Sequence, residues 1–137
     1  MPLYTCRAQS RPSLTDFYSQ LLSSDDAHTV DVGAGMLTLL ELVHHAFPLT
    51  PIWGLTSLYQ LHLLAHDDDC TPWYVAVAAA GRQEYWLEYL LPAAEAPWPG
   101  AFVRGRAHSL PQVLEYLRTA MRRSGGWPHS PELGRGR

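Results

Sequence analysis

The sequence predicts an α+β fold, in which three helices pack on an antiparallel, four-stranded meander sheet in the order α-α-β-β-β-β-α. Apolar residues recur every three or four positions before residue 48 and again after residue 109, as in amphipathic helices. Between residues 58 and 106 the apolar repeat is about two, and the segments are rich in aromatic and β-branched residues, as in strands. This change of period along the chain indicates the fold class.

Two helices are predicted in the first third of the chain. Ser13 can cap the first helix, and the apolar residues that follow have the spacing of one helix face: Leu14, Phe17, Tyr18, Leu21 and Leu22. Residues 23–26 favour a turn because Ser and Asp prefer local hydrogen bonds. The second helix is predicted to begin near Gly35 and to end before Pro48, since proline cannot donate a helical hydrogen bond.

Four strands are predicted after a loop over residues 48–54, at residues 58–65, 73–79, 84–91 and 102–106. The first three are joined by links of a few residues, whereas a parallel pair needs a crossover of about a dozen or more. Neighbouring strands are therefore expected to be antiparallel.

The third helix is predicted to begin after Ser109, which forms a capping-box pattern with Gln112, and to end at Gly125. A chain of 137 residues can enclose one ordinary hydrophobic core. We therefore expect a single α+β domain over residues 1–133. Residues 134–137, which alternate glycine and arginine without an apolar anchor, are expected to form a flexible tail.

Acidic and basic residues are separated along the chain. Residues 1–103 hold eleven of the thirteen acidic side chains and three arginines, a net charge of about −8, whereas residues 104–137 hold seven arginines and two glutamates, about +5. Because phosphate would be repelled by most of such a surface, we expect a basic protein partner and no nucleic acid. No apolar run approaches the roughly 18 residues of a membrane span, and the first residues lack a signal-peptide pattern, so we expect no membrane association and a cytoplasmic location.

One short motif resembles a cofactor site. Asp31-Val32-Gly33-Ala34-Gly35 is similar to the first motif of S-adenosylmethionine-dependent methyltransferases, in which a strand runs into a glycine-rich turn before a helix. That fold also needs a parallel sheet and a second acid about 20 positions on, and residues 48–60 contain no acid. We therefore expect a tight turn into the second helix and no cofactor, and a diverged methyltransferase-like protein remains the alternative.

Potential metal ligands lie close together in the sequence around residues 62–70. His62, His66 and the acidic run that follows offer metal ligands, but the two histidines would lie roughly 13 Å apart along a strand. The run itself is expected to form a solvated hairpin turn. Since no Gly-x-Ser-x-Gly or comparable nucleophile setting is present, the sequence predicts no metal, no catalytic residue and no enzymatic activity.

The final part of the chain carries a family resemblance. Residues 85–92, 96–100 and 119–127 resemble small bacterial immunity proteins, which accompany secreted antibacterial toxins. The resemblance implies a cytoplasmic inhibitor that binds a cognate toxin, for example a nuclease, and occludes its active or substrate-binding surface. Such families share no catalytic residues, so none is carried over.

An acidic contact set follows from the charge distribution and this implied role. A nuclease must be basic where it holds phosphate, and an acidic inhibitor can be steered to that surface. The predicted partner-binding residues are Asp67, Asp68, Asp69, Glu84, Glu88, Asp25 and Asp26. A third possibility is an adaptor domain that self-associates through an exposed sheet face near Trp73 and Trp86; the sequence leaves the oligomeric state open.

Overall fold

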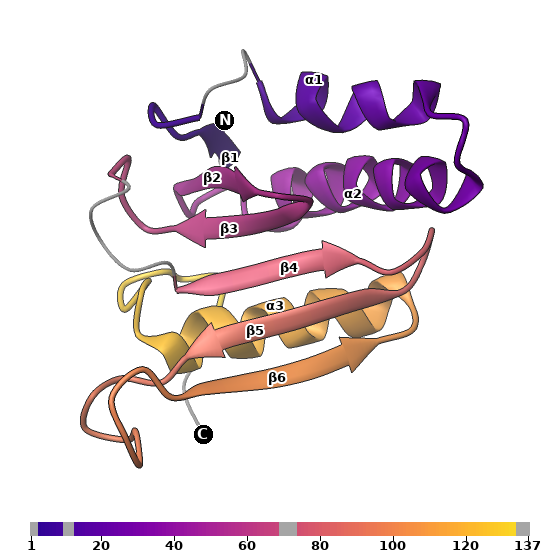
Figure 1. Cartoon of the computed structure of the whole chain (residues 1–137). Helices are drawn as coiled ribbons and strands as arrows, with labels where there is room; N and C mark the ends of the chain where they lie inside the picture. Colours follow the sequence, from indigo (N-terminus) through magenta and orange to yellow (C-terminus); the bar gives the residue numbers. More distant parts are fainter. Residues whose placement is uncertain (1–2, 10–12, 69–73, 134–137) are drawn as a thin grey trace.

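The computed structural model describes residues 3–9, 13–68 and 74–133 (Figure 1). Helices and strands follow one another as β1 (Leu3–Thr5), α1 (Leu14–Ser19), the 3-10 helix η1 (Gln20–Ser23), α2 (Ala27–Ala46), β2 (Ile52–Ser57), β3 (Gln60–Leu64), β4 (Val75–Ala79), β5 (Tyr85–Leu90), β6 (Phe102–Ala107) and α3 (Leu110–Ser124). None of the helices described has the length and hydropathy needed to cross a bilayer. The predicted tail, residues 134–137, lies outside the described residues.

The six strands form one sheet in the spatial order β1-β2-β3-β4-β5-β6. β1 pairs with β2 in parallel, and every other neighbouring pair is antiparallel. The prediction of an α+β fold with three helices is confirmed, but the prediction of four purely antiparallel strands was wrong. The sheet is mixed and has two more strands, β1 and β2, on the side of β3 away from β4.

The missed strand β2 explains the difference in the middle of the chain. Ser57 pairs with Gln60, so the hairpin turn lies at Leu58, where the predicted strand was expected to begin. Leu58 adopts a left-handed backbone with φ 54°, which is a turn conformation. The predicted loop over residues 48–54 therefore contains the first half of β2, which starts directly after Pro51.

Helix α2 begins earlier than predicted. Asp26 caps it, since its Oδ2 accepts a hydrogen bond from the Thr29 N–H at 3.0 Å. Gly33 and Gly35 therefore lie inside the helix, and the expected turn at these glycines was wrong. A Cβ on Gly33 would lie 2.8 Å from the Cβ of Leu21, and a Cβ on Gly35 would overlap the carbonyl oxygen of Gly81. The glycines allow close packing of α2 rather than a turn.

The predicted helix caps are present at both other helices. Ser13 Oγ accepts from the Asp16 N–H at 3.0 Å, and Ser109 Oγ accepts from the Gln112 N–H at 3.2 Å. Gly125 ends α3 in the left-handed conformation, with φ 78°. The first helix is shorter than its apolar pattern, because the chain tightens into η1 after Ser19.

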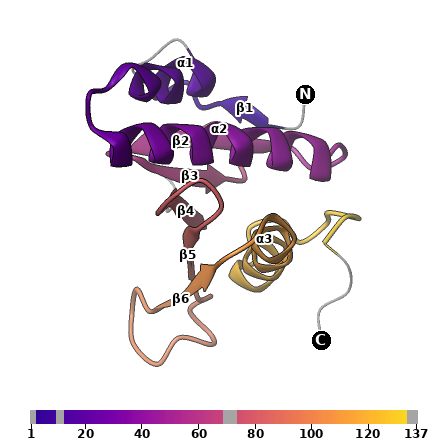
Figure 2. The ribbon, with the colours of Figure 1, turned by 90° about the vertical axis from the view of Figure 1, so that its right-hand side faces the viewer.

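Helices α2 and α3 cover one face of the sheet (Figure 2). Side chains on β5 alternate accordingly, with Tyr85, Leu87 and Tyr89 buried and Trp86 exposed. Tyr85 contacts α2, and Leu87 and Tyr89 lie beside α3, so both helices lie on the same face. The hydrophobic core occupies the space between this face and the two helices.

Candidate protein-binding surface

The structure separates the acidic residues that the sequence suggested as a contact set. Asp67 and Asp68 follow β3, whereas Glu84 directly precedes β5. Because β4 runs the length of the sheet between these points, they lie at opposite ends of it (Figure 1). Asp25 and Asp26 lie just before α2, at the end of the sheet nearer to Glu84. Asp69 lies outside the described residues.

Several of these carboxylates have partners within the molecule. Glu88 pairs with Arg104 at 2.8 Å and Glu84 with Arg106 at 2.9 Å. Asp26 caps α2, and its hydrogen bonds to Thr29 lower the pKa of its carboxyl group. Asp67 Oδ1 accepts from the Arg7 N–H at 2.7 Å. The candidate residues thus do not form one continuous acidic patch.

A second candidate surface is the face of the sheet that points away from α2 and α3. Trp86, Glu88 and Leu90 point to this side of β5, because they alternate with the buried residues of that strand. Strand register extends the set to residues on the neighbouring strands: Tyr4, Trp53, Leu55, His62, Leu64, Ala76, Ala78, Phe102, Arg104 and Arg106. We call this set the open face; Leu64 and Ala76 within it are only 2% exposed, and its exposed part lies mainly on β5 and β6. No helix of the described residues covers it (Figure 2).

Aromatic and arginine side chains are paired on the part of this face that β5 and β6 form. Trp86 is 41% exposed, and the guanidinium carbon of Arg106 lies 4.6 Å from its ring centroid. Phe102 is 48% exposed, with the guanidinium carbon of Arg104 at 5.2 Å. These distances are those of cation–π contacts. Since Glu84 and Glu88 hold the same two arginines, the aromatic rings are flanked by fixed charges.

His62 lies on the open face two strands away from Glu88, with Ala76 between them in register. Burial lowers the pKa of His62, and the negative charge of Glu88 partly opposes this shift. The imidazole is therefore expected to be neutral at physiological pH, which suits an interface of mixed apolar and polar character.

A hollow of about 570 Å³ adjoins the open face in the connection between β5 and β6. Leu90 borders the hollow and also belongs to the open face. Trp98, in the same connection, is 67% exposed. The exposed aromatic side chains Trp86, Phe102 and Trp98 thus come from two adjoining strands and the loop that joins them.

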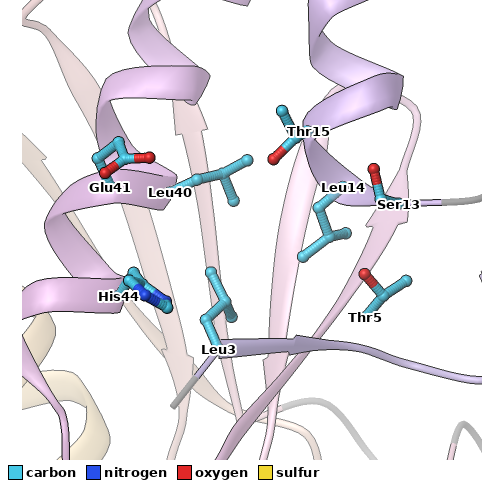
Figure 3. Close-up of a pocket in the computed structure, with 8 residues that line it drawn as sticks. All are labelled: Leu3, Thr5, Ser13, Leu14, Thr15, Leu40, Glu41 and His44. Carbon is cyan, nitrogen blue, oxygen red and sulfur yellow. The ribbon is translucent and has the colours of Figure 1, made fainter. Parts of the chain in front are cut away.

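A second hollow, of about 180 Å³, lies between β1, α1 and α2 (Figure 3). It contains Glu41, His44 and Ser13, a set that could suggest acid–base chemistry. Glu41 pairs instead with His45, at 3.1 Å. Leu3 and Leu14 lie between His44 and Ser13 in Figure 3, and the Ser13 hydroxyl caps α1. The geometry offers no nucleophile next to a base here.

The methyltransferase-like motif has a structural explanation. Its residues are helical throughout rather than a strand followed by a turn. Asp31 Oδ1 accepts from Arg82 Nε at 2.9 Å, which ties α2 to the connection between β4 and β5.

Among the residues that the structure describes, no three or more His, Cys, Asp or Glu side chains are grouped so that they could hold a metal ion.

Comparisons with family models, with curated proteins and with solved structures find no match to this chain. The assignment of the open face as a binding surface is therefore based on the geometry of the structure. Trp86 and Glu88 were among the contact residues considered from the sequence, whereas Arg104 and Arg106 were not. A signal was present: Arg104 and Arg106 alternate with a spacing of two, as a row of charges on one side of a strand would.

Proposed function

We propose that the protein is a non-enzymatic immunity protein that binds a secreted antibacterial toxin through the open face of its sheet. The observation that carries this proposal is the exposure of Trp86 and Phe102, each held against an arginine, on a face that no described helix covers. Globular proteins rarely expose large contiguous apolar surface unless it binds something. Tryptophan and arginine are also the residues most enriched among interface hot spots.

The charge distribution supports a basic partner. The acidic part of the chain, residues 1–103, carries eleven acids against three arginines. A field of one sign acts over a Debye length and raises the association rate of an oppositely charged protein. The acids Asp25, Asp26, Asp67, Asp68 and Asp69 would then steer the toxin to the protein, while the aromatic side chains make the central contacts.

Self-association through the same face is the second candidate, because two copies could cover each other's exposed aromatic side chains. Sedimentation analysis distinguishes the candidates. A monomer over a wide concentration range supports a foreign partner, whereas a dimer that dissociates on Trp86→Ala substitution supports an adaptor role.

The proposed function is tested by co-purifying the tagged protein with the catalytically disabled product of the neighbouring gene, across a salt series. We expect a stoichiometric complex whose association rate falls as salt rises. Trp86→Ala should weaken it, whereas Leu49→Ala, at a position 70% exposed in the loop before β2, should not. Absence of a complex, together with absence of protection of cells that express the active toxin, would exclude the proposal.

A further inference from the structure

Strand β6 forms one edge of the sheet. It pairs with β5 over six residues, and no other strand of the described residues pairs with it. The opposite edge is formed by β1, which has only three residues. A long unpaired edge is a template for the addition of a further strand, unless side chains or a covering element block it.

The hydrogen bonds show which backbone groups of β6 point outward. The Leu91 N–H donates to the Ala101 carbonyl at 3.0 Å, toward β6, whereas the Leu90 N–H donates to the Tyr74 carbonyl on the other side. Successive residues of a strand direct these groups to opposite sides. The backbone groups of Phe102, Arg104 and Arg106 therefore face away from β5, along the edge.

An apolar groove of about 230 Å³ runs beside this edge, between β6 and α3. Its walls include Leu87, Val103, Tyr116 and Ala120. Gly105 contributes no side chain, and a Cβ there would lie 3.8 Å from the Tyr116 ring, an ordinary contact distance. A strand added to β6 would direct every second side chain into this groove.

The other side chains of an added strand would lie on the open face beside Arg104 and Arg106. Arg104 contacts Glu88 through Nε and Nη2, and Arg106 contacts Glu84 through Nη2, so each guanidinium keeps further N–H donors. Residues 102–133 carry five arginines against two glutamates. Acidic side chains on the added strand would be favoured here, because opposite charges on adjacent strands stabilise a sheet.

A second copy of this chain fits the edge poorly. Antiparallel pairing of two β6 strands over their full length would place Arg104 opposite Arg104 or Arg106 of the other copy. Like charges directly opposite one another on adjacent strands are destabilising. The occupant is better matched by another protein whose extended segment carries acids in place of these arginines.

We propose that the β6 edge binds an extended segment of another protein by strand addition, and that this segment alternates apolar side chains, which enter the groove, with acidic ones, which lie beside Arg104 and Arg106. The recognition mode is β-augmentation, in which backbone hydrogen bonds give affinity and alternate side chains give specificity. This site shares Arg104 and Arg106 with the open face, but the outward backbone groups of β6 and the groove beside α3 lie outside that face, so the inference does not depend on the proposed function.

The test uses a blocked peptide, Ser-Glu-Val-Glu-Leu-Glu-Val-Glu-Ser, with wild-type protein and amide hydrogen exchange. Without peptide, the amides of Phe102, Arg104 and Arg106 should exchange fast, whereas those of Val103 and Gly105 should be protected. The peptide should protect the first set. N-methylation of the peptide amides that face β6 should abolish binding, and N-methylation of the alternate amides should not.

Three protein variants refine the result. Arg104→Pro removes an outward N–H and the charge, and Arg104→Ala removes the charge alone; we expect the proline variant to bind roughly tenfold more weakly than the alanine variant. Gly105→Leu should fill the groove and reduce binding at least as much. All three variants are checked for native circular dichroism.

Three outcomes would overturn the proposal. The first is that the peptide does not bind at millimolar concentration. The second is that a peptide with the same residues rearranged into an acidic block and an apolar block binds equally well. The third is that dimer formation protects the outward amides of β6 in the absence of peptide. Equal binding of the peptide with lysine in place of glutamate would refute the acidic specificity.

Discussion

The hydroxyl of Tyr85 donates a hydrogen bond to the backbone carbonyl of Gly35 at 2.7 Å, and so joins β5 to the middle of α2. The contact is possible because α2 carries no side chain at this position and passes directly against the turn at Gly81. The buried side chain of Tyr85 thus fixes the distance between α2 and β5.

Gly35→Ala should destabilise the fold. The added methyl group overlaps the carbonyl oxygen of Gly81 and lies 2.9 Å from the Cβ of Ala79, so backbone must move. We expect a loss of about 1–3 kcal/mol, which outweighs the gain in helix propensity of about 1 kcal/mol. Urea unfolding measures this, with Gly81→Ala as the control, since its Cβ would be 3.9 Å from the nearest atom. Unchanged stability of Gly35→Ala would contradict the packing role of the glycine.

Stability should fall at alkaline pH because of the buried tyrosines. Burial raises the pKa of Tyr85 to about 12, and it also raises the pKa of Tyr18. Since an unfolded tyrosine titrates near 10, the native state retains protons that the unfolded state loses. The free energy of unfolding should therefore decline as the pH rises from about 10 to 12.

Tyr85→Phe tests this directly. It should cost about 1 kcal/mol at neutral pH, through loss of one hydrogen bond, and should make the alkaline decline shallower. Urea unfolding at a series of pH values measures both effects. An alkaline decline identical to that of the unsubstituted protein would exclude Tyr85 as its source.

The amphipathic helices and four of the six strands could be predicted because their patterns agree with their environment. In β5 the alternation is regular, and in α3 the cap, apolar stripe and terminal Gly125 all indicate the same element. The start of α2 could not be predicted, because Gly33 and Gly35 favour turns locally and only the tertiary packing of α2 explains them. β1 has three residues, too few for a period to be visible.

The open face could be predicted only in part for a similar reason. Which side of a strand faces the helices depends on how the helices pack, and the sequence of β5 carries apolar residues on both sides. Likewise Glu84 and Glu88 were predicted to contact a partner, because the arginines that neutralise them are 16 or more positions away in the sequence. Which acid meets which arginine depends on the strand register, and the register is known only once the sheet is described.

Substitution of the exposed aromatic side chains should separate binding from stability. Trp86→Ala combined with Phe102→Ala should lower the free energy of unfolding by only about 1–3 kcal/mol, because the rings are partly exposed and the loss is confined to two cation–π contacts and part of the ring surface. The double substitution should weaken binding of the proposed toxin partner at least a hundredfold if both rings are hot spots, about 3 kcal/mol. Calorimetric titration and thermal unfolding measure the two quantities. A large loss of stability without a binding defect would assign these rings to folding instead.

Charge reversal should affect the rate of association. Asp67→Arg, Asp68→Arg and Asp69→Arg together should slow association with the proposed toxin partner roughly tenfold at low salt and have a smaller effect at high salt. Stopped-flow mixing across a salt series measures this. Dissociation should change little, and an unchanged association rate would remove these residues from the proposed steering surface.

The turn between β2 and β3 contains a strained residue. Leu58 has φ 54° and is 89% exposed, so its side chain gains little from burial. Leu58→Gly should raise stability by about 0.5–1 kcal/mol, because glycine adopts this conformation without a steric penalty. Leu58→Ala, which keeps the Cβ, should have almost no effect. Equal results for the two variants would show that the backbone is not strained here.

The environment of His62 makes a prediction about acid pH. Its pKa should lie below 6.5, and Glu88→Gln should lower it further, since the carboxylate opposes the effect of burial. Because the native state binds this proton less readily than the unfolded state, stability should fall as pH drops below about 6.5. NMR titration of the imidazole checks the shift, with Glu115→Gln on α3 as the control. A rise in the pKa on Glu88→Gln substitution would contradict the assignment.

Parallel pairing of β1 with β2 imposes an order on folding. The β2–β3, β4–β5 and β5–β6 pairs join segments that are close in sequence, whereas Leu3 and Ile52 are separated by α1, η1 and α2. Contacts between distant positions carry the larger loop-closure cost and form late. We therefore expect the antiparallel strands to assemble first and β1 to join last, which makes the β1 edge the first part of the sheet to open when the native state fluctuates.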